Sequence, residues 1–575
     1  MPSLDNSSFL DQQLANLLVR ICATEGYPLT AAQQQQLSFL ASYTSQATRQ
    51  GIIAAQLPTS LSLLELTVLL KSPVVGGAGD YKPLIIENEH IWLNRYWQYE
   101  QQLAQNIVAR LAHKLPLEPA ALQTILNNWF PAADNDLQRL AVERAATLPF
   151  LIISGGPGTG KTTTVTRLLC LLIEHFKIDP NRIKLAAPTG KAAMRMQEAI
   201  RQTKANLQLA PELAAVIPEQ GSTLHRLLGY LPGKVGFRHH AHYPLPADVV
   251  IVDEASMIDI SLMSYLFAAV RPDARLILLG DRDQLASVET GSIFRDLCST
   301  DRELLLDEHI VALEKSWRFD ASGGIGQLAK AIRDQQEQQV VDILHTAPTG
   351  VTWDKNTQLN IGYLRHVWRN YLTGVRAWQQ DLSQLPELFA AFNQFRLLTP
   401  LRKGSLGTEQ LNQKISQFLW RYLSTRLQQA WFAGRPIMIT ENDYRQNLFN
   451  GDIGLTLPDV NGQLKVWFPE PKGGFRAFAP VRLPAHETAW AMTIHKSQGS
   501  EFEQVLLVMP EDAEAQILGR ELLYTGITRA RSQIDLMGSE QVILAAIRRS
   551  LPSTSCLRWR IQNLSSTQSS QTQSE

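Results

Sequence analysis

Gly155-Gly-Pro-Gly-Thr-Gly-Lys-Thr162 is the stretch of this 575-residue chain that decides its fold. It matches the phosphate-binding loop pattern G-x-x-x-x-G-K-[ST] at every fixed position. The apolar run Phe150–Ile153 precedes it and predicts a strand, and the apolar stretch Val165–Ile173 follows it and predicts a helix. Glycines let such a loop aim backbone N–H groups at phosphate oxygens, and the helix N-terminus adds a favourable dipole. The sequence therefore predicts a nucleotide site at the end of a strand.

The residue types of this loop suit a nucleoside triphosphate and its metal ion. Lys161 would bridge the β- and γ-phosphates, and the Thr162 hydroxyl would ligate Mg²⁺. ATP and Mg²⁺ are therefore the expected cofactors. The residues expected around the phosphates are those of the loop and the threonine after it: Gly155, Gly156, Pro157, Gly158, Thr159, Gly160, Lys161, Thr162 and Thr163.

Polar residues follow two further apolar stretches at the point where each predicted strand ends. Asp253 and Glu254 follow Val249–Val252. Asp253 would hold Mg²⁺, and Glu254 would orient and deprotonate the attacking water. Gln284 follows Leu276–Leu279 and could contact the γ-phosphate. Taken alone, the acidic pair could cap a helix and Gln284 could lie in a surface turn, but beside a phosphate loop both favour an ATPase site.

Two arginines are candidates for stabilising the phosphoryl group during transfer. Arg318 lies in Leu313–Phe319, and Arg529 lies in Leu523–Arg531. A guanidinium stabilises the negative charge that spreads over the phosphate oxygens. A single arginine is more often part of a surface ion pair, so both assignments depend on the wider set of motifs.

The composition limits the possible classes of protein. Basic and acidic residues both number 54, so any nucleic-acid site must be a local groove rather than a generally basic surface. The four cysteines are scattered without zinc spacing, and no signal peptide is apparent, which favours a cytoplasmic protein. No apolar run of roughly 18 residues suggests a membrane span.

The pattern of apolar residues changes along the chain. Residues 1–112 carry helical spacing at Phe9–Ala23, Ala31–Ser45 and Leu61–Leu70. From about residue 120, short apolar stretches alternate with helical patterns, which is typical of a mostly parallel α/β sheet. Residues 426–485 instead predict short strands joined by turns. The other predicted strands are Phe150–Ile153, Ile183–Ala187, Val249–Val252, Leu276–Leu279, Arg396–Thr399, Val505–Val508 and Ile534–Met537.

The motifs occur in the order found in superfamily 1 helicases, and the resemblance covers about residues 135–540. The phosphate loop resembles motif I, and the others resemble motifs Ia to VI: Ala187–Ala193, Asp253–Ser256, Gly280–Gln284, Ser316–Arg318, Ala491–Glu501 and Tyr524–Ala530. The resemblance implies that Gln138 reads the adenine and that Gly499 and Glu501 contact the nucleotide. It implies DNA contacts from Pro188, Thr189, Gly190, Lys191, Thr223, His225, Thr493 and His495, although either histidine could equally be structural.

Four further stretches resemble the RecD-like branch of this superfamily: Trp92–Trp97 with Glu100, Thr223–Gly229, Asp253–Asp259 and Asn450–Gly454. The resemblance implies 5′-to-3′ movement on single-stranded DNA. It also implies a heterotrimer with RecB-like and RecC-like subunits, an exodeoxyribonuclease V that processes duplex DNA ends for recombinational repair. The nuclease site is then expected on a partner, because Asp80-Tyr-Lys82 is the nearest approach to a nuclease motif here and has no carboxylate cluster upstream.

The expected fold is α/β, with two RecA-like parallel-sheet domains, a small SH3-like β-barrel insert and a mainly helical N-terminal domain. The expected boundaries are 1–112 for the N-terminal partner-binding domain, 120–335 for the first motor domain, 336–425 with 486–563 for the second, 426–485 for the insert and 564–575 for a disordered tail. A stand-alone RecD-like helicase and a chiefly structural subunit remain open as alternatives. A P-loop ATPase that is not a helicase would leave the resemblance to motifs Ia and V unexplained.

Overall fold

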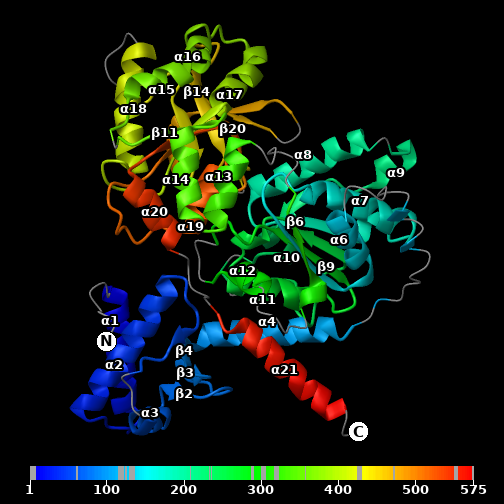
Figure 1. Cartoon of the computed structure of the whole chain (residues 1–575), viewed down its shortest axis with the longest axis vertical. Helices are drawn as coiled ribbons and strands as arrows, with labels where there is room; N and C mark the ends of the chain where they lie inside the picture. The colour runs from blue at the N-terminus through cyan, green and yellow to red at the C-terminus, as the bar shows by residue number, and fades with distance from the viewer. Residues whose placement is uncertain are drawn as a thin grey trace.

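The structure is a computed structural model in which two α/β lobes lie beside an N-terminal region (Figure 1). It describes residues 8–59, 63–113, 115, 122–123, 126–127, 136–207, 209–231, 233–234, 236–286, 291–299, 306–315, 323–356, 358–423, 430–443, 445–470, 473–549 and 555–572.

The first lobe is built on a six-stranded parallel sheet of order β10–β5–β9–β8–β6–β7. Along β5, Phe150 and Ile152 enter one core while Leu151 and Ile153 enter another, because successive side chains of a strand point to opposite faces. Both faces are therefore covered by helices, as the apolar runs predict. The strands are β5 (Phe150–Gly155), β6 (Ile183–Ala187), β7 (Gly221–Thr223), β8 (Val249–Val252), β9 (Arg275–Gly280) and β10 (Ile310–Leu313). The helices are α6 (Asp136–Thr147), α7 (Lys161–Glu174), α8 (Gly190–Asn206), α9 (Pro211–Val216), α10 (Leu224–Leu228), α11 (Ile260–Ala269) and α12 (Ile293–Cys298).

The second lobe repeats the plan with a five-stranded parallel sheet of order β11–β20–β19–β12–β18. Its strands are β11 (Val351–Asp354), β12 (Phe395–Thr399), β18 (Ala491–Thr493), β19 (Phe502–Val508) and β20 (Ala530–Met537). Its helices are α13 (Gly324–Arg333), α14 (Glu337–Thr346), α15 (Ile361–Val367), α16 (Arg369–Arg376), α17 (Leu385–Asn393), α18 (Thr408–Leu423), α19 (Arg520–Ile527) and α20 (Glu540–Arg548). Ile325, Leu328 and Ile332 of α13 share a core with Val505 and Ile534, so this lobe begins before the predicted boundary at 335.

An antiparallel sheet of order β16–β15–β14–β13–β17 interrupts the second lobe. Its strands are β13 (Pro436–Ile439), β14 (Ile453–Pro458), β15 (Leu464–Pro469), β16 (Phe475–Phe478) and β17 (His486–Thr488). We call it the insert. It extends to Thr488, beyond the expected end at 485, because β17 pairs with β13. Among the described residues, no pairing joins the outer strands β16 and β17.

The N-terminal region combines helices with a small sheet of order β1–β4–β3–β2. The sheet was not predicted, because its strands are only two to four residues long: β1 (Ala55–Gln56), β2 (Val75–Gly76), β3 (Leu84–Glu87) and β4 (His90–Leu93). The helices are α1 (Phe9–Thr24), α2 (Ala31–Arg49), α3 (Leu63–Leu70) and α4 (Asn94–Leu111). α4 runs along the underside of the first lobe (Figure 1). Leu103, Ile107 and Val108 of α4 enter the first lobe's core, so the predicted boundary at 112 cuts through one core.

The expected disordered tail is instead largely helical. Helix α21 (Leu557–Thr572) crosses α4 in Figure 1, and only residues 573–575 of the predicted tail lie outside the described part. Leu557 and Ile561 are fully buried in the first lobe's core. This anchored first turn supplies the costly helix nucleus, and the Ser- and Gln-rich residues then extend it.

Candidate functional site

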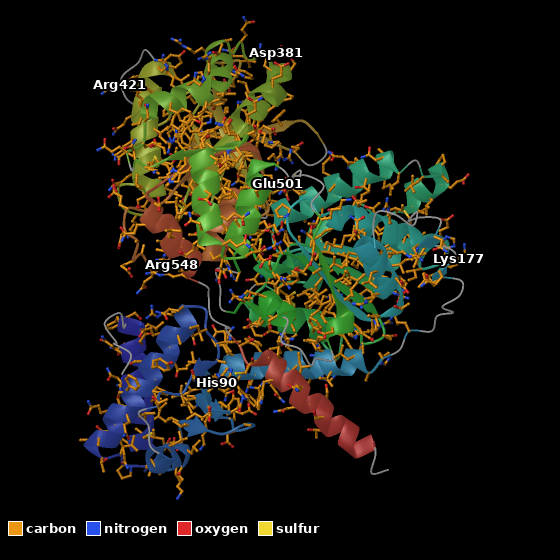
Figure 2. The ribbon with its side chains drawn as sticks, in the orientation of Figure 1. His90, Lys177, Asp381, Arg421, Glu501 and Arg548 are labelled. Atoms are coloured by element: carbon orange, nitrogen blue, oxygen red, sulfur yellow. The ribbon has the colours of Figure 1, made fainter. Side chains whose placement is uncertain are left out.

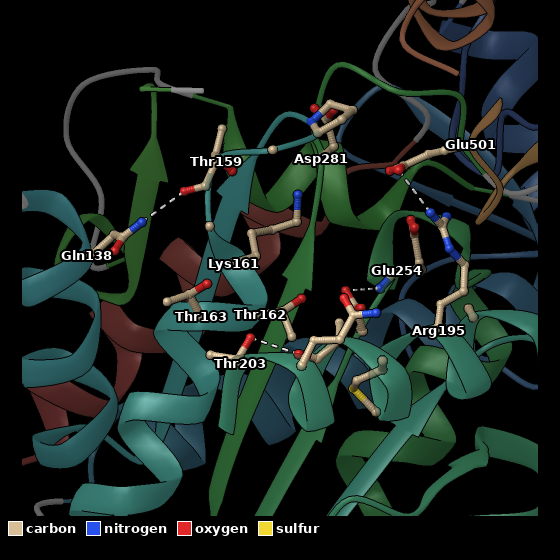
Figure 3. Close-up of a pocket in the computed structure, with 18 of the residues that line it drawn as sticks. Gln138, Thr159, Lys161, Thr162, Thr163, Arg195, Thr203, Glu254, Asp281 and Glu501 are labelled. Carbon is tan, nitrogen blue, oxygen red and sulfur yellow. Dashed lines mark hydrogen bonds and ion pairs between the residues drawn. The ribbon is translucent and has the colours of Figure 1, made fainter. Parts of the chain in front are cut away.

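The glycine-rich loop joins β5 to α7, as the sequence predicts. Gly158 and Gly160 have φ angles of 77° and 85°, a left-handed conformation that favours glycine. Lys161 is the first residue of α7, and its Nζ donates to the carbonyl oxygens of Gly155 at 2.5 Å and Gly156 at 3.1 Å. The ammonium group therefore points back over the loop, where phosphate oxygens could replace these carbonyl oxygens (Figure 3).

A cavity of about 710 Å³ opens over this loop. Gln138 lies at one end of it, and its Nε2 donates to the Thr159 carbonyl oxygen at 3.1 Å. Gly155, Gly156 and Gly499 do not line the cavity, although the first two hold the Lys161 ammonium. The predicted residues that line it are Gln138, Pro157, Gly158, Thr159, Gly160, Lys161, Thr162, Thr163, Asp253, Glu254, Gln284, Glu501 and Arg529.

Carboxylates from the ends of two strands form one wall of the cavity. The Glu254 backbone N–H donates to Asp253 Oδ1 at 2.8 Å, and Glu254 has a positive φ of 52°, which is uncommon outside glycine and often marks a functional position. Burial and the neighbouring Glu254 raise the pKa of Asp253 to about 6, while Lys161 opposes the rise. Burial also raises the pKa of Asp281, which follows β9. Cationic and metal ligands would stabilise these carboxylates in their charged form.

The second lobe reaches this wall through Arg529, which is 2% exposed. Its Nη2 donates to Gln284 Oε1 of the first lobe at 2.7 Å, and its Nη1 donates to the Ser500 carbonyl oxygen at 3.1 Å. The adjacent Leu285 backbone N–H donates to Thr525 Oγ1 at 2.8 Å, so the loop after β9 is bonded to the second lobe. The predicted residues Gln284 and Arg529 are thus in direct contact. Arg318 lies outside the described residues.

Several cavity-lining residues were not predicted. Asp281 stands inside the stretch compared with motif III, and Tyr524 donates to its Oδ2 at 3.3 Å. Arg195 follows Lys191 by four residues, a spacing that places both on one face of a helix and was a signal available in the sequence. The other unpredicted lining residues come from α7 and α8: Arg167, Ala192, Met196, Ala199, Gln202, Thr203 and Asn206.

The residues proposed for DNA gather at one edge strand of each sheet, while the cavity lies at the centre of the first sheet. Pro188, Thr189, Gly190 and Lys191 follow β6, and the register pairs Ala187 with Thr223 at the end of edge strand β7. In the second lobe the register pairs Thr399 with Thr493 at the end of edge strand β18, and His495 follows it. The two groups therefore occupy corresponding places in the two sheets.

Some of these side chains also have structural partners. The hydroxyls of Thr189 and Thr223 accept bonds from Ala192 N and Arg226 N and cap α8 and α10. The centroid of the His225 ring lies 5.6 Å from that of the Phe237 ring. This contact supports the alternative that His225 has a structural role. Lys191 is half-buried near Asp452 of the insert, and burial lowers the pKa of Lys191 to about 7.

A further basic loop next to this edge was not predicted. Arg402 and Lys403 are exposed and follow β12, the neighbour of β18. Arg402 Nε donates to Glu409 Oε1 at 3.1 Å. The signal in the sequence was a cation-bearing loop directly after the apolar predicted strand Arg396–Thr399.

The tryptophan-rich stretch of the N-terminal region is a core cluster. Trp92 Nε1 donates to Glu100 Oε2 and Trp97 Nε1 donates to Glu87 Oε2, both at 2.8 Å. Arg560 of α21 also pairs with Glu87 at 2.7 Å and lies over both indole rings. These tryptophans therefore join the N-terminal region to the C-terminal helix.

The stretch that resembled a nuclease motif makes turn contacts instead. Asp80 Oδ2 accepts from Gly77 N at 3.0 Å, and Lys82 Nζ donates to the carbonyl oxygens of Leu70 and Val75. In the part of the chain that the structure describes, no group of three His, Cys, Asp or Glu side chains could hold a metal ion. Among the described residues we find no helix with the length and apolar character that crossing a bilayer requires.

Comparisons with known proteins agree with this geometry. Residues 138–290 match the family model described as AAA domain, and residues 488–536 match the UvrD-like helicase C-terminal domain. The chain is 36% identical to the RecBCD enzyme subunit RecD of Haemophilus influenzae, over 84% of this chain and 82% of that protein. It is 37% identical to the subunit of the same name from Mycolicibacterium smegmatis, over 86% of each chain. It is 32% identical to the ATP-dependent RecD2 DNA helicase of Deinococcus radiodurans, over 73% of this chain but 51% of that protein.

Proposed function

We propose that this chain, which belongs to the RecD family and is an ATP-dependent DNA helicase subunit of a RecBCD enzyme, uses ATP hydrolysis between its lobes to move 5′ to 3′ along single-stranded DNA. The contact that carries the proposal is the 2.7 Å hydrogen bond from Arg529 of one lobe to Gln284 of the other, at the wall of the cavity. A nucleotide bound here would touch both lobes. Its hydrolysis would change their separation, which is the event a translocating motor needs.

Each lining residue then has a role. Lys161 binds the β- and γ-phosphates, Glu254 activates water, and Gln284 and Arg529 contact the γ-phosphate. Gln138 lies at the cavity end suited to the adenine. Arg318, outside the described residues, is kept as a second arginine for the phosphoryl group.

The Thr162 hydroxyl and the Asp253 carboxylate both line the cavity and fit Mg²⁺, which prefers oxygen ligands. When bound, the ion would offset the negative charge of the nucleotide's phosphates. Glu501 lies at the far side of the cavity from Gln138 and remains the candidate from motif V for contacting the nucleotide (Figure 3).

The DNA path would follow the edge strands of the two sheets. Backbone N–H groups and hydroxyls after β6, β7 and β18 could bind phosphates, which carry no sequence information and suit an enzyme that must pass any sequence. Arg402 and Lys403 extend this path in the second lobe. We propose that the insert is an SH3-like barrel. It borders the DNA path through the Phe449 ring, which packs against Gly190 and would lie 3.7 Å from a Cβ atom at that position.

The proposed assembly is a cytoplasmic heterotrimer with RecB-like and RecC-like subunits that processes duplex DNA ends, with the nuclease on a partner. Support comes from the relatives: the chain is 36% and 37% identical to two RecBCD enzyme subunits named RecD and 32% identical to the RecD2 helicase. The N-terminal region, before α4 joins the first lobe, is the proposed partner-binding part. Because the cavity brings Lys161, Glu254 and Arg529 together, a purely structural subunit has less support.

One purification tests both the proposed ATPase site and the proposed assembly. The tagged full-length chain is isolated as the native protein and as Lys161→Gln, with Lys177→Gln as the control because Lys177 is exposed at the far surface of the first lobe (Figure 2). We expect the native and control proteins to be purified together with two large partners and to show DNA-stimulated ATPase activity. Lys161→Gln should keep the partners and, assayed as the chain alone, lose hydrolysis. Undiminished hydrolysis in that variant would refute the site, and recovery of the native chain alone with unwinding from a 5′ overhang would favour a stand-alone helicase.

A further inference from the structure

An ion pair between the lobes separates the nucleotide cavity from a second cavity. Arg195 Nη2 of α8 lies 3.0 Å from Glu501 Oε2 of the second lobe (Figure 3). Both side chains line the 710 Å³ cavity and also a neighbouring one of about 470 Å³ between α8 and the insert. The Glu501 side chain is only 11% exposed. The Arg195 side chain is 35% exposed, so solvent screens the pair in part, and the pair links one lobe to the other.

The start of α8, which carries Arg195, contacts the second lobe at several points. Lys191 and Arg195 are four residues apart and share one face of the helix. Lys191 lies opposite Asp452, and the helix start at Gly190 packs against the Phe449 ring. Arg195 and Glu501, and likewise Lys191 and Asp452, thus face each other across the two lobes.

Glu501 is connected through the backbone to Arg529. Its neighbour Ser500 accepts a hydrogen bond from Arg529 Nη1 at 3.1 Å through its carbonyl oxygen. Arg529 Nη2 in turn donates to Gln284 of the first lobe at 2.7 Å. Glu501 Oε2 also pairs with Arg531 of the second lobe at 3.2 Å. The Ser500–Glu501 segment therefore lies between Arg195 of the first lobe and two arginines of its own lobe, Arg529 and Arg531. A displacement of Glu501 would move the carbonyl oxygen that orients the Arg529 guanidinium.

We propose that Arg195 is a positioning residue for the ATPase: through Glu501 it fixes the Ser500–Glu501 segment, and so sets where Arg529 stands when the lobes close. The inference rests on the proposed ATPase function and adds to it a residue outside the quoted motifs. Arginine suits the task because its guanidinium is always charged and presents a rigid fork of donors to a carboxylate. Arg195 needs no contact with the reacting atoms for this role.

The kinetic test uses the full-length chain in a DNA-stimulated ATPase assay. Arg195→Gln is expected to lower kcat roughly 10- to 100-fold while KM for ATP changes little, because the nucleotide binds but Arg529 is misplaced. Arg195→Lys should retain part of the rate. The double variant Arg195→Gln with Glu501→Gln should lose no more activity than Glu501→Gln alone, since Arg195 is proposed to act only through Glu501.

The matched control is Arg201→Gln. Arg201 lies on the same helix and its ion pairs, with Glu198 and Glu219, stay within the first lobe. This variant should keep the native kcat. Equal behaviour of Arg195→Gln and Arg201→Gln would overturn the inference, as would a raised KM with an unchanged kcat, which would indicate nucleotide binding alone.

A spectroscopic readout decides the inference independently of turnover. The native cysteines Cys22, Cys170, Cys298 and Cys556 are buried, so spin labels can be directed to cysteines introduced at the exposed positions Lys177 and Arg421, one in each lobe. Without nucleotide, Arg195→Gln should broaden and lengthen the distance distribution between the labels. An unchanged distribution would contradict the role of the pair. Absence of hydrolysis in the native chain would instead contradict the proposed function, whatever the distances show.

Discussion

The first lobe meets its two neighbours in opposite ways. Against the second lobe it uses separate contacts: the polar pairs Gln284–Arg529 and Arg195–Glu501 lie at the nucleotide cavity, and Leu285 adds an apolar contact with the second lobe's core. Against the N-terminal region it shares a hydrophobic core, in which Leu103 and Ile107 of α4 are fully buried. Polar contacts can be exchanged for bonds to water or phosphate at little net cost, whereas a shared core cannot open without exposing apolar area. The difference indicates that one boundary works as a hinge and the other is permanent.

The largest effect is expected at the polar boundary from Arg529→Gln. We expect kcat for DNA-stimulated ATP hydrolysis to fall roughly 10³-fold or more, as for other arginines that stabilise a transferring phosphoryl group. ATP affinity should change little, because the first lobe supplies nearly all of the cavity lining. Steady-state kinetics and equilibrium nucleotide binding on the same preparation measure both quantities.

The control for this change is Arg548→Gln, which removes an exposed arginine of the same lobe that pairs with Glu337. It should leave kcat at the native value. If Arg529→Gln weakened ATP binding as strongly as turnover, the arginine would serve the ground state, and the lobes would already be closed on bound nucleotide before hydrolysis.

The permanent boundary is tested by Ile107→Ala. The fully buried side chain lies in the core that α4 shares with the first lobe, so its truncation should cost about 2 to 5 kcal/mol of unfolding free energy. Denaturant unfolding should show this loss as a lower midpoint with an unchanged slope. ATP hydrolysis by the protein that remains folded should be close to native.

Gln105→Ala is the matched control, because Gln105 is exposed on the same helix. Stability equal to that of the control would show that α4 docks loosely on the first lobe. The two boundaries would then differ less than their contacts indicate, and the N-terminal region could move as a unit.

The site was more predictable from the sequence than the boundaries between its parts. The loop between β5 and α7 was found because its residues are consecutive, and strands such as Val249–Val252 were found because both faces are buried and the whole run is apolar. The pair Arg195–Glu501 was not found, because its members are far apart in the sequence and only the fold brings them together. α21 was missed for a different reason: its polar composition hides the buried Leu557 and Ile561 that anchor it.

The smallest predicted effect concerns Glu100, a fully buried carboxyl within the permanent boundary. Burial raises the pKa of Glu100 to about 7, although the Arg560 charge and the hydrogen bond from the Trp92 N–H both act to lower it. Below pH 4.5 the carboxyl is protonated in both the folded and the unfolded chain. Between that pH and about 7 the unfolded chain ionises first, so this group's contribution to stability is lost as the pH rises, by up to roughly 3 kcal/mol.

Glu100→Gln removes this titration, while its side-chain oxygen can still accept from Trp92. The Tm of the variant relative to the native protein should therefore increase from pH 5 to pH 8, as measured by thermal unfolding of the full-length chain at both values. Glu25→Gln, at an exposed position, should give the same Tm difference at both pH values. If the Tm of Glu100→Gln relative to the native protein decreased as the pH rose, the Glu100 carboxylate would be ionised in the folded chain. Arg560 and Glu100 would then form a net-stabilising buried ion pair, and charge as well as apolar area would hold the permanent boundary closed.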